Sequence, residues 1–299
     1  MTITSLASNE ISVRLGNAPI GAEIVGVDLA QDIDAGVIEK IKEAYYRHSV
    51  VYFRNQQLTP EQQVRFSRRF GELEIHVLKD YLLPGYPEIL VLSNIVEDGK
   101  PVGLADAGRV AVWHTDMSYL KEPSAGSALY SLEVPHSAAG GSLGDTMFAS
   151  TAAAYDALPE DMKRKLAGLK AVHHMTKGYD NDATASSSRI TYSDEQRRQV
   201  PDVAHPVIRT HPVTGRKCIY INQLCVTGIV DMPDEESAPL LEALYGHCTR
   251  PEFVYRHRWR VGDLLMWDNC SVQHLAVQDY ALPQRRRMHR TTIKGFVPF

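Results

Sequence analysis

The chain has 299 residues, 44 % of them hydrophobic and 23 % charged, with a formal net charge of −4, which is ordinary for a soluble globular protein. Its one basic cluster, around Arg285–Arg290, is too short to form the broad basic face of a nucleic-acid-binding protein. No apolar run reaches the roughly 18 residues that a membrane-spanning helix requires, so we expect neither a nucleic-acid nor a membrane partner.

The N-terminal third of the chain is predicted to alternate between strands and helices. Runs rich in Val, Ile, Tyr and Phe predict strands at Glu23–Leu29, Val50–Phe53 and Ile89–Ser93. Apolar residues at helical spacing predict a helix from Asp34 to His48. A second helix should begin after Thr59 and run to about Phe70, because the Thr-Pro-Glu-Gln sequence at 59–62 joins a capping box to a proline at the first helical position.

The rest of the chain is predicted to be richer in strands. Ser150 caps a short helix that reaches about Leu158, and further helices are expected at Glu160–Leu169 and Ala238–Cys248. The expected strands are Gly126–Val134, Thr146–Ala149, Leu169–Met175, Pro206–Thr210, Lys217–Asn222, Phe253–Arg258, Asp263–Trp267 and Met288–Lys294. Many strands with a few peripheral helices favour a mainly β protein with a jelly-roll core, and a mixed α/β fold is the alternative.

No linker or internal repeat divides the chain, so residues 1–299 are predicted to form one domain. The most irregular stretch is Lys177–Val203, and we predict a mobile lid at about 177–203, because long loops inside compact domains are often active-site covers. The four cysteines show no CxxC spacing, and the N-terminal residues show no apolar core of signal-peptide length. Both features indicate reduced thiols in a cytoplasmic protein.

A His-x-Asp sequence at His114–Asp116 is the first candidate for metal chemistry. If this stretch is a strand, residues i and i+2 point to the same face, so His114 and Asp116 can meet one ion while Thr115 points away. The third ligand must come from far along the chain, and His274 is the best candidate. Two histidines and one carboxylate leave coordination positions open, which suits an Fe(II) oxygenase.

The His-x-Asp pattern alone has low specificity, because the chain contains 12 histidines and such pairs often arise by chance. Several other histidines lack comparable partners and are interpreted as surface or hydrogen-bonded core residues: His173, His174, His205, His211, His247 and His257. A zinc-dependent hydrolase that uses the same His-x-Asp sequence is one alternative function. A non-catalytic module that binds anions through arginines is the other.

Arg286 and Arg290 are the second candidate feature. In a strand, their side chains would share a face with Met288. Guanidinium groups bind carboxylates in a bidentate, directional way, and a buried cationic pair requires an anion. The pattern predicts a site for anionic oxygens beside the metal, with surface ion pairs to Asp or Glu as the alternative.

Segments spread over nearly the whole chain follow the order and spacing of one known family. They are Gly21–Leu29, Val50–Arg54, Phe66–Glu74, Trp113–Asp116, Gly140–Thr146, Val254–Trp259, Gly262–Leu264, Trp267–Asn269, His274 and the arginine stretch at 285–290. Each piece is modest, but their joint order is specific. By these segments the chain resembles the taurine dioxygenase / 2,4-dichlorophenoxyacetate dioxygenase family.

The resemblance implies a double-stranded β-helix fold and an Fe(II)- and 2-oxoglutarate-dependent dioxygenase that consumes O₂. It implies that His114, Asp116 and His274 hold Fe(II), and that Arg286 and Thr146 bind the distal carboxylate of 2-oxoglutarate. The implied substrate is a small anionic compound, such as an aryloxyalkanoate or an alkylsulfonate, whose hydroxylation often breaks a C–O or C–S bond. Dimers or tetramers are common in that family, so a homo-oligomer is an expectation.

The resemblance also implies a substrate-binding group made of His76, Lys79 and Arg290. Sulfonate-oxidising members place a histidine at the position of His76, and phenoxyacetate-oxidising members use a lysine at that of Lys79. Both occur here together, so the pocket copies neither type. Val110 stands where taurine-oxidising members have an asparagine, which argues against recognition of an amino group. Extra residues between Gly141 and Thr146 depart from the family's usual Gly-Gly-Asp-Thr sequence.

Overall fold

The computed structural model describes residues 11–104, 112–175 and 200–299. Its largest sheet has the strand order β1-β2-β3-β16-β8-β18-β5-β4, and its neighbouring strands are antiparallel except for the parallel pair β2–β3. The bounds are β1 Ser12–Leu15, β2 Ala22–Val25, β3 Val50–Phe53, β4 Leu82–Leu83, β5 Tyr86–Ser93, β8 Gly126–Glu133, β16 Leu264–Asp268 and β18 Arg287–Ile293.

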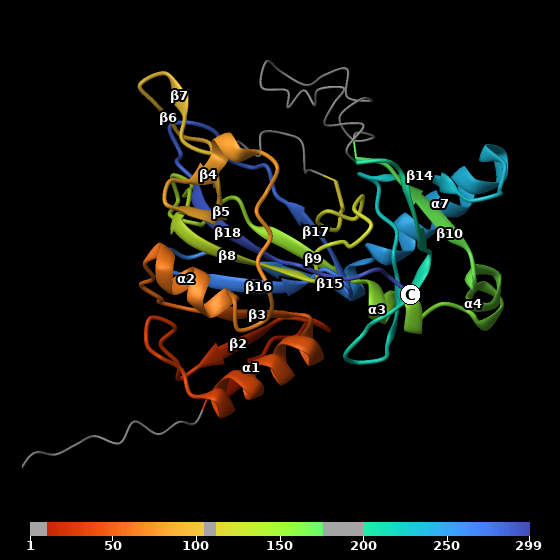
Figure 1. Cartoon of the computed structure of the whole chain (residues 1–299), viewed down its shortest axis with the longest axis horizontal. Helices are drawn as coiled ribbons and strands as arrows, with labels where there is room; N and C mark the ends of the chain where they lie inside the picture. The colour runs from red at the N-terminus through yellow and green to blue at the C-terminus, as the bar shows by residue number, and fades with distance from the viewer. Residues whose placement is uncertain (1–10, 105–111, 176–199) are drawn as a thin grey trace, which may run out of the picture.

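A smaller sheet packs against one face of the large one. It consists of β15 (Val254–His257), β9 (Thr146–Ser150) and β17 (Val272–Ala276), with β9 in the middle. Leu265 and Met288 of the large sheet share one buried cluster with Phe148 and Val272 of the small sheet. Figure 1 shows the strands of both sheets gathered in the middle of the molecule. This double-sheet core confirms the predicted jelly-roll class.

Helices cover the other face of the large sheet. They are α1 (Ala35–His48), which Figure 1 shows beneath β3, and α2 (Pro60–Ser67). Because side chains alternate along a strand, β16 sends Leu265 into the cluster between the sheets and Leu264 into a separate cluster with Ile41 and Phe66 of these helices. The alternation gives the large sheet two buried faces.

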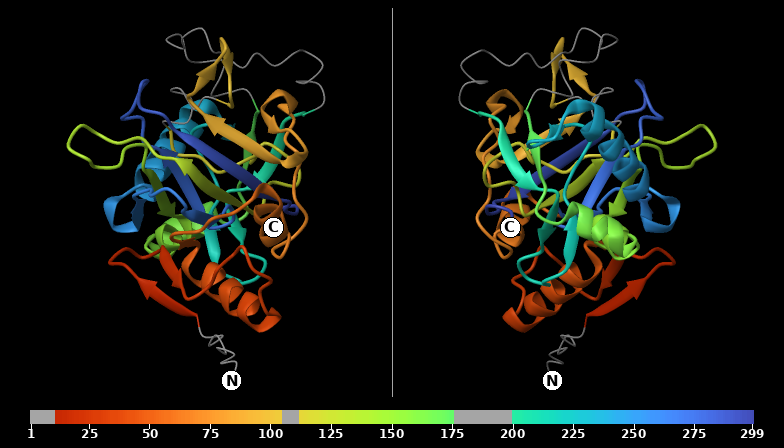
Figure 2. Two further views of the ribbon diagram at one scale, coloured as in Figure 1. Left: turned by 90° about the vertical axis from the view of Figure 1, so that its left-hand side faces the viewer. Right: turned by 90° about the vertical axis from the view of Figure 1, so that its right-hand side faces the viewer.

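A second lobe extends the small-sheet end of the molecule. It contains α3 (Thr151–Asp156), α4 (Glu160–Leu166), α7 (Asp234–Cys248), β10 (Lys170–His173), β11 (Val203–Pro206), β12 (Ile208–Thr210), β13 (Lys217–Ile219) and β14 (Val226–Ile229). Its apolar residues form their own buried cluster, which includes Leu166, Ile219 and Leu244. Short 3-10 turns lie at Lys79–Tyr81 and Pro251–Phe253. Figure 2 shows the hairpin of β6 (Val96–Glu97) and β7 (Lys100–Pro101) at the end of the molecule opposite to α1.

Most predicted elements are confirmed, with shifted ends. The strand at Val50–Phe53 and the capping box of Thr59 and Gln62 match the structure. The strand predicted at Glu23–Leu29 stops at Val25, where Gly26 takes a positive φ of 94°. The strand predicted at Pro206–Thr210 is divided between β11 and β12, and α7 begins four residues before the predicted Ala238. The sequence did not predict β1, β4, β6, β7, β14 or β17.

Three other expectations concern organisation and environment. Residues 177–199 of the predicted lid lie outside the described residues, so the lid stays a prediction, as does the single-domain organisation. In the described part of the chain, no helix is both long and apolar enough to cross a membrane. The cysteines Cys218, Cys225, Cys248 and Cys270 are buried free thiols, as expected.

Asp263 is a buried carboxylate at the turn between the two sheets. Its Oδ2 accepts hydrogen bonds from Nη1 of Arg54, from Nε2 of His257 at 3.2 Å and from the backbone N–H of Arg260 at 2.8 Å. We predict that Asp263→Ala lowers the free energy of unfolding by about 3–5 kcal/mol, because the buried donors and the Arg54 charge lose their acceptor. Urea denaturation measures this loss.

The matched control is Glu160→Ala, which removes an exposed ion pair with Lys163. Exposed pairs contribute little to stability, so the urea midpoint of this variant should stay close to that of the unmodified protein. Equal shifts of the urea midpoint in the two variants would show that the buried carboxylate of Asp263 contributes no more to stability than an exposed one.

Candidate active site

Two histidines from distant parts of the chain are joined through their backbones. His114 and His274 form an antiparallel bridge in which each backbone N–H donates to the other residue's carbonyl, at 3.0 and 2.7 Å. Residues directly opposite each other in an antiparallel pair project to the same side. The imidazole rings accordingly lie 4.1 Å apart between centroids, and both residues are buried.

Asp116 completes the group. The strand considered for 114–116 is only a single bridge at His114, because the chain turns at Asp116 and Met117 has a positive φ of 54°. The turn still brings Asp116 to the two rings: one ligand atom from each of the three residues lies within 4.8 Å of the others. The structure therefore brings together the three side chains that the sequence analysis selected.

The hydrogen bonds of these residues leave ligand atoms available. His114 Nδ1 lies 3.0 Å from the carbonyl of Val112, so Nδ1 is the protonated nitrogen and Nε2 keeps its lone pair. Asp116 Oδ2 accepts a hydrogen bond from Ser127 Oγ at 2.8 Å, and Oδ1 lies 3.9 Å from Nε2 of His274. Nδ1 of His274 is buried without a hydrogen-bond partner among the described residues.

Asp116 is held in place by a set of hydrogen bonds that the sequence analysis did not identify. Ser127 lies on β8 and binds the carboxylate, and Ser124 donates to the Asp116 carbonyl at 3.1 Å. Asn269 donates to both serines, at 2.9 and 3.3 Å, and accepts from Trp267 Nε1 at 3.0 Å. The sequence offered only the Trp267–Asn269 motif, and nothing in it linked that motif to Asp116.

The site holds its ligands in the protonation states that a metal needs. Burial would raise the pKa of Asp116, but the charge of Arg290, the two histidines and the Ser127 hydrogen bond together bring it well below its ordinary value. Burial, followed by repulsion from His114, lowers the pKa of His274 to about 3. The carboxylate is therefore ionised and the His274 imidazole neutral at neutral pH.

A second group of potential ligands, His211, Asp268 and Cys270, is a structural cluster. His211 Nδ1 accepts hydrogen bonds from the backbone N–H groups of Val213 and Thr214, so Nε2 carries the proton that bonds to Asp268 Oδ2 at 2.6 Å. Burial, followed by the charge of Asp268, raises the pKa of the Cys270 thiol. With no free lone pair on the ring and no thiolate, this group lacks the donors that a metal requires, and His211 is a hydrogen-bonded core residue, as predicted.

The two arginines enter the site from the strand opposite. Arg290 lies on β18, and its Nη1 is 3.0 Å from Asp116 Oδ1. Arg286 is buried just before that strand, where Asn94 accepts its backbone N–H at 2.8 Å. Within β18, alternation places Met288 and Arg290 on one face, and Met288 packs in the core between the sheets. Arg290 therefore pairs with a buried carboxylate and not with an Asp or Glu of the surface.

Gly144 gives the Arg286 side chain its space. Its φ is 68°, and a Cβ at this position would lie 3.2 Å from Arg286 Cδ and 2.9 Å from Tyr280 Cε1. The extra residues between Gly141 and Thr146 thus end at a glycine that packs directly beneath Arg286. A buried guanidinium that packs against a glycine can bind a carboxylate.

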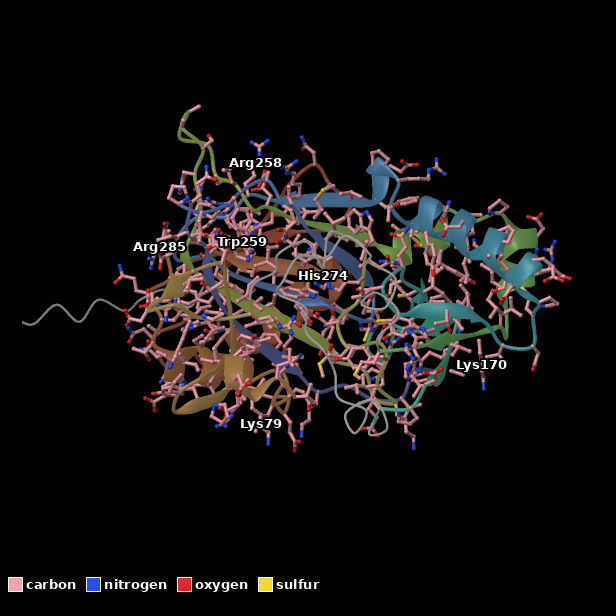
Figure 3. The ribbon with its side chains drawn as sticks, turned by 90° about the horizontal axis from the view of Figure 1, so that it is seen from above. Lys79, Lys170, Arg258, Trp259, His274 and Arg285 are labelled. Atoms are coloured by element: carbon pink, nitrogen blue, oxygen red, sulfur yellow. The ribbon has the colours of Figure 1, made fainter. Side chains whose placement is uncertain are left out.

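The remaining predicted site residues lie in different surroundings. Thr146 is buried on β9, opposite Ala276 and two residues from the Phe148–His274 pair. His76 is half-buried, and burial followed by the charge of Arg290 lowers its pKa to about 4, which places it within electrostatic reach of the site. Lys79 is exposed, and Figure 3 shows it at the outer edge of the molecule while His274 lies inside. Val110 lies outside the described residues.

Comparison with known proteins agrees with this geometry. Residues 12–292 match the model of the family described as "Taurine catabolism dioxygenase TauD, TfdA family". The chain is 36 % identical over 280 residues to the alpha-ketoglutarate-dependent 2,4-dichlorophenoxyacetate dioxygenase of Cupriavidus pinatubonensis, covering 91 % of this chain and 93 % of that protein. Alpha-ketoglutarate is another name for 2-oxoglutarate.

Two further relatives extend the likeness. The chain is 34 % identical over 295 residues to the alpha-ketoglutarate-dependent sulfate ester dioxygenase of Pseudomonas putida, covering 97 % of this chain and 91 % of that protein. The crystal structure of AAD-2 in complex with Mn(II) and N-oxalylglycine superimposes with a TM-score of 0.81 at 31 % identity, covering 97 % of this chain and 98 % of that one.

Ser127 offers a test of the metal group that leaves all three ligands in place. We predict that Ser127→Ala weakens the binding of a divalent ion about tenfold to hundredfold, because Asp116 loses the hydrogen bond that orients it. Calorimetric titration of the protein with Mn(II) measures the affinity. The control is Ser131→Ala on the same strand, which bonds to the carbonyl of Arg260 and should leave Mn(II) affinity unchanged. Equal affinities in the two variants would contradict the orienting role of Ser127.

Proposed function

Because the chain belongs to the family of taurine catabolism dioxygenases that contains TauD and TfdA, we propose that it oxidises a small substrate carrying a single acidic group. The reaction class is that of its relatives: the chain is a 2-oxoglutarate-dependent dioxygenase that uses Fe(II). The proposed substrates are aryloxyalkanoates, alkylsulfonates and related acids such as alkyl sulfates. Hydroxylation beside the ether oxygen or the sulfur would break the C–O or C–S bond.

The observation that carries this proposal is the position of Arg290, whose guanidinium lies 3.0 Å from the metal-ligand carboxylate of Asp116. Asp116 occupies one N–H of this guanidinium, and the other N–H groups can donate to an anion. A single guanidinium at this position favours a substrate with one acidic group over a neutral compound.

Each residue has a separate task in the proposed site. His114, Asp116 and His274 would hold Fe(II) on one side, which leaves the opposite side open to ligands. Arg286 and Thr146 would fix the distal carboxylate of 2-oxoglutarate, and Arg290 with the neutral imidazole of His76 would hold the acidic group of the substrate. When bound, Fe(II) and 2-oxoglutarate would supply the oxidation itself, in which one oxygen atom of O₂ enters the substrate as a hydroxyl and the other enters succinate as the keto acid loses CO₂.

Aromatic side chains keep water away from the metal group. The Phe148 ring stacks on His274 at 6.1 Å, and the Trp267 ring lies 5.0 Å from it. Both belong to the buried cluster between the sheets. Exclusion of water strengthens the interactions of the arginines with bound carboxylates, and it holds the reacting carbon at one position.

The two alternative functions find no support here. A zinc-dependent hydrolase would have no use for two arginines directed into the core beside the metal ligands. A metal-free anion-binding module would leave the grouping of His114, Asp116 and His274 unexplained. The four buried free cysteines support a reducing, cytoplasmic environment, which we propose together with a homo-oligomeric state implied by the resemblance.

Matched acid and neutral compounds test the substrate proposal. We predict that phenoxyacetate or a short alkylsulfonate stimulates 2-oxoglutarate-dependent O₂ uptake and succinate formation, whereas the methyl ester of phenoxyacetate does not, because it cannot pair with Arg290. Taurine should be a poorer substrate than propanesulfonate, because Val110 has no side-chain amide that could bind an amino group. Equal rates with the acid and its ester would reject the proposal.

Crossed substitutions separate the two arginines. Arg286→Ala should raise the KM for 2-oxoglutarate more than the KM for the acid, and Arg290→Ala should do the reverse. Each lost charge-assisted bond is worth about 1.5–3 kcal/mol, or roughly a tenfold to hundredfold change. Steady-state kinetics with each compound varied in turn measure both constants.

Lys79→Ala belongs in the same series. If Lys79 binds the substrate, Lys79→Ala should raise the KM for the acid as Arg290→Ala does. Lys79 is exposed, and an unchanged KM for the acid in this variant would show that it does not bind the substrate.

Equal increases of both KM values in Arg286→Ala and in Arg290→Ala would contradict the division of tasks between the two arginines.

A further inference from the structure

Trp259 makes one hydrogen bond with a residue of the proposed cosubstrate site. Its indole Nε1 lies 3.0 Å from Oγ1 of Thr146, and both residues are buried. An indole N–H is a donor only, so the threonine oxygen must accept. The single hydroxyl proton of Thr146 is therefore directed away from Trp259, and among the described residues it meets no acceptor.

The position of Thr146 shows what that proton faces. Thr146 pairs with Ala276, and Phe148, two residues further along β9, pairs with His274. Residues two apart on a strand share a face, so the Thr146 side chain lies on the face that carries His274. Gly144, two residues before Thr146, packs against Arg286. Thr146 thus follows a residue that packs against Arg286 and shares a strand face with the residue that pairs with His274.

Trp259 is itself held in one orientation by its neighbours. Its ring meets the His257 ring edge to face at 4.6 Å, and His257 bonds to both Asp263 and the hydroxyl of Tyr255. Burial alternates along this stretch, because His257 and Trp259 point inward while Arg258 is exposed, as Figure 3 shows for Trp259 and Arg258. A ring fixed in this way directs its N–H to one place.

We propose that Trp259 is a positioning residue for cosubstrate binding: its indole N–H fixes the Thr146 hydroxyl so that the hydroxyl proton points to the distal carboxylate of 2-oxoglutarate. The inference rests on the proposed roles of Thr146 and Arg286. Without the indole N–H, the hydroxyl rotates among several orientations, and the carboxylate must order it on binding. The loss falls on 2-oxoglutarate affinity and leaves metal affinity unchanged.

A double-mutant cycle tests this coupling. Calorimetric titration of the Zn(II)-loaded protein with 2-oxoglutarate gives a Kd for Trp259→Phe, Thr146→Val and the double variant. Loss of one neutral hydrogen bond corresponds to about a threefold to tenfold weaker Kd. If Trp259 acts through Thr146, the double variant should bind no more weakly than the weaker single variant. If the factors by which the two single substitutions raise the Kd multiply in the double variant, the proposal is overturned.

Two further comparisons separate positioning from general loosening. Tyr45→Phe removes another buried aromatic donor, which bonds to the Trp267 carbonyl, and should leave the Kd for 2-oxoglutarate unchanged. In steady state, Trp259→Phe should raise the KM for 2-oxoglutarate while kcat stays within about twofold. A similar Kd increase in Tyr45→Phe would identify a nonspecific packing effect and would reject the positioning role.

A spectroscopic measurement needs no change at Trp259. The chain has three tryptophans, and indole ¹⁵N labelling gives one N–H signal for each. In the Zn(II)-loaded protein, one signal should shift on addition of 2-oxoglutarate, and Thr146→Val should move the same signal and abolish its response. If no indole signal responds both to 2-oxoglutarate and to Thr146→Val, the inference fails. This test does not require Trp259→Phe to fold.

These affinities also distinguish a failure of the positioning role of Trp259 from a failure of the proposed cosubstrate site. If Arg286→Ala and Thr146→Val both leave the Kd for 2-oxoglutarate unchanged, the proposed cosubstrate site is wrong. If both weaken it while Trp259→Phe does not, the cosubstrate site stands and only the positioning role of Trp259 is rejected.

Discussion

The site depends on the reciprocal backbone hydrogen bonds between His114 and His274. Each such bond contributes only about 0.5–1.5 kcal/mol net, so the pair needs support from both sheets. His274 is held by the pairing of β17 with β9, and Asp116 is tied to β8 of the large sheet through Ser127. The metal group therefore bridges the two sheets. An ion that binds this group only in the folded state also stabilises the fold.

Charge is the second constraint on the interior. The ionised carboxylate of Asp116 lies beside the guanidinium of Arg290 and the neutral imidazole of His274. The nearby cluster of His211 and Asp268 shows the opposite case, in which every donor and acceptor of the ring is already satisfied. Both clusters are buried and contain potential metal ligands. Among the described residues, only the first has an imidazole nitrogen without a hydrogen-bond partner. That difference, more than residue type, identifies the functional site.

Much of the fold could be predicted from local patterns, because alternation and capping act over a few residues. The strand at Val50–Phe53 and the Thr59 cap are examples. The strand that carries His274 could not be predicted, since Gln273 and His274 are polar residues buried in it, and burial of Gln273 depends on a hydrogen bond to the distant carbonyl of Ile221. Alternation along a strand was the geometry considered for His114 and Asp116; the segment is a bridge followed by a turn, and it still brings both ligands together. Ser127 and Asn269 were missed because their role exists only in the tertiary structure.

The most direct test of the metal group is an anaerobic titration of the metal-free protein with Fe(II) in the presence of 2-oxoglutarate, followed by the visible charge-transfer absorption of an iron-bound keto acid. The absorption should saturate at one Fe(II) per chain and should be absent from the Asp116→Ala variant. An undiminished absorption in that variant, or none in the unmodified protein, would contradict the assignment of His114, Asp116 and His274 as the ferrous site.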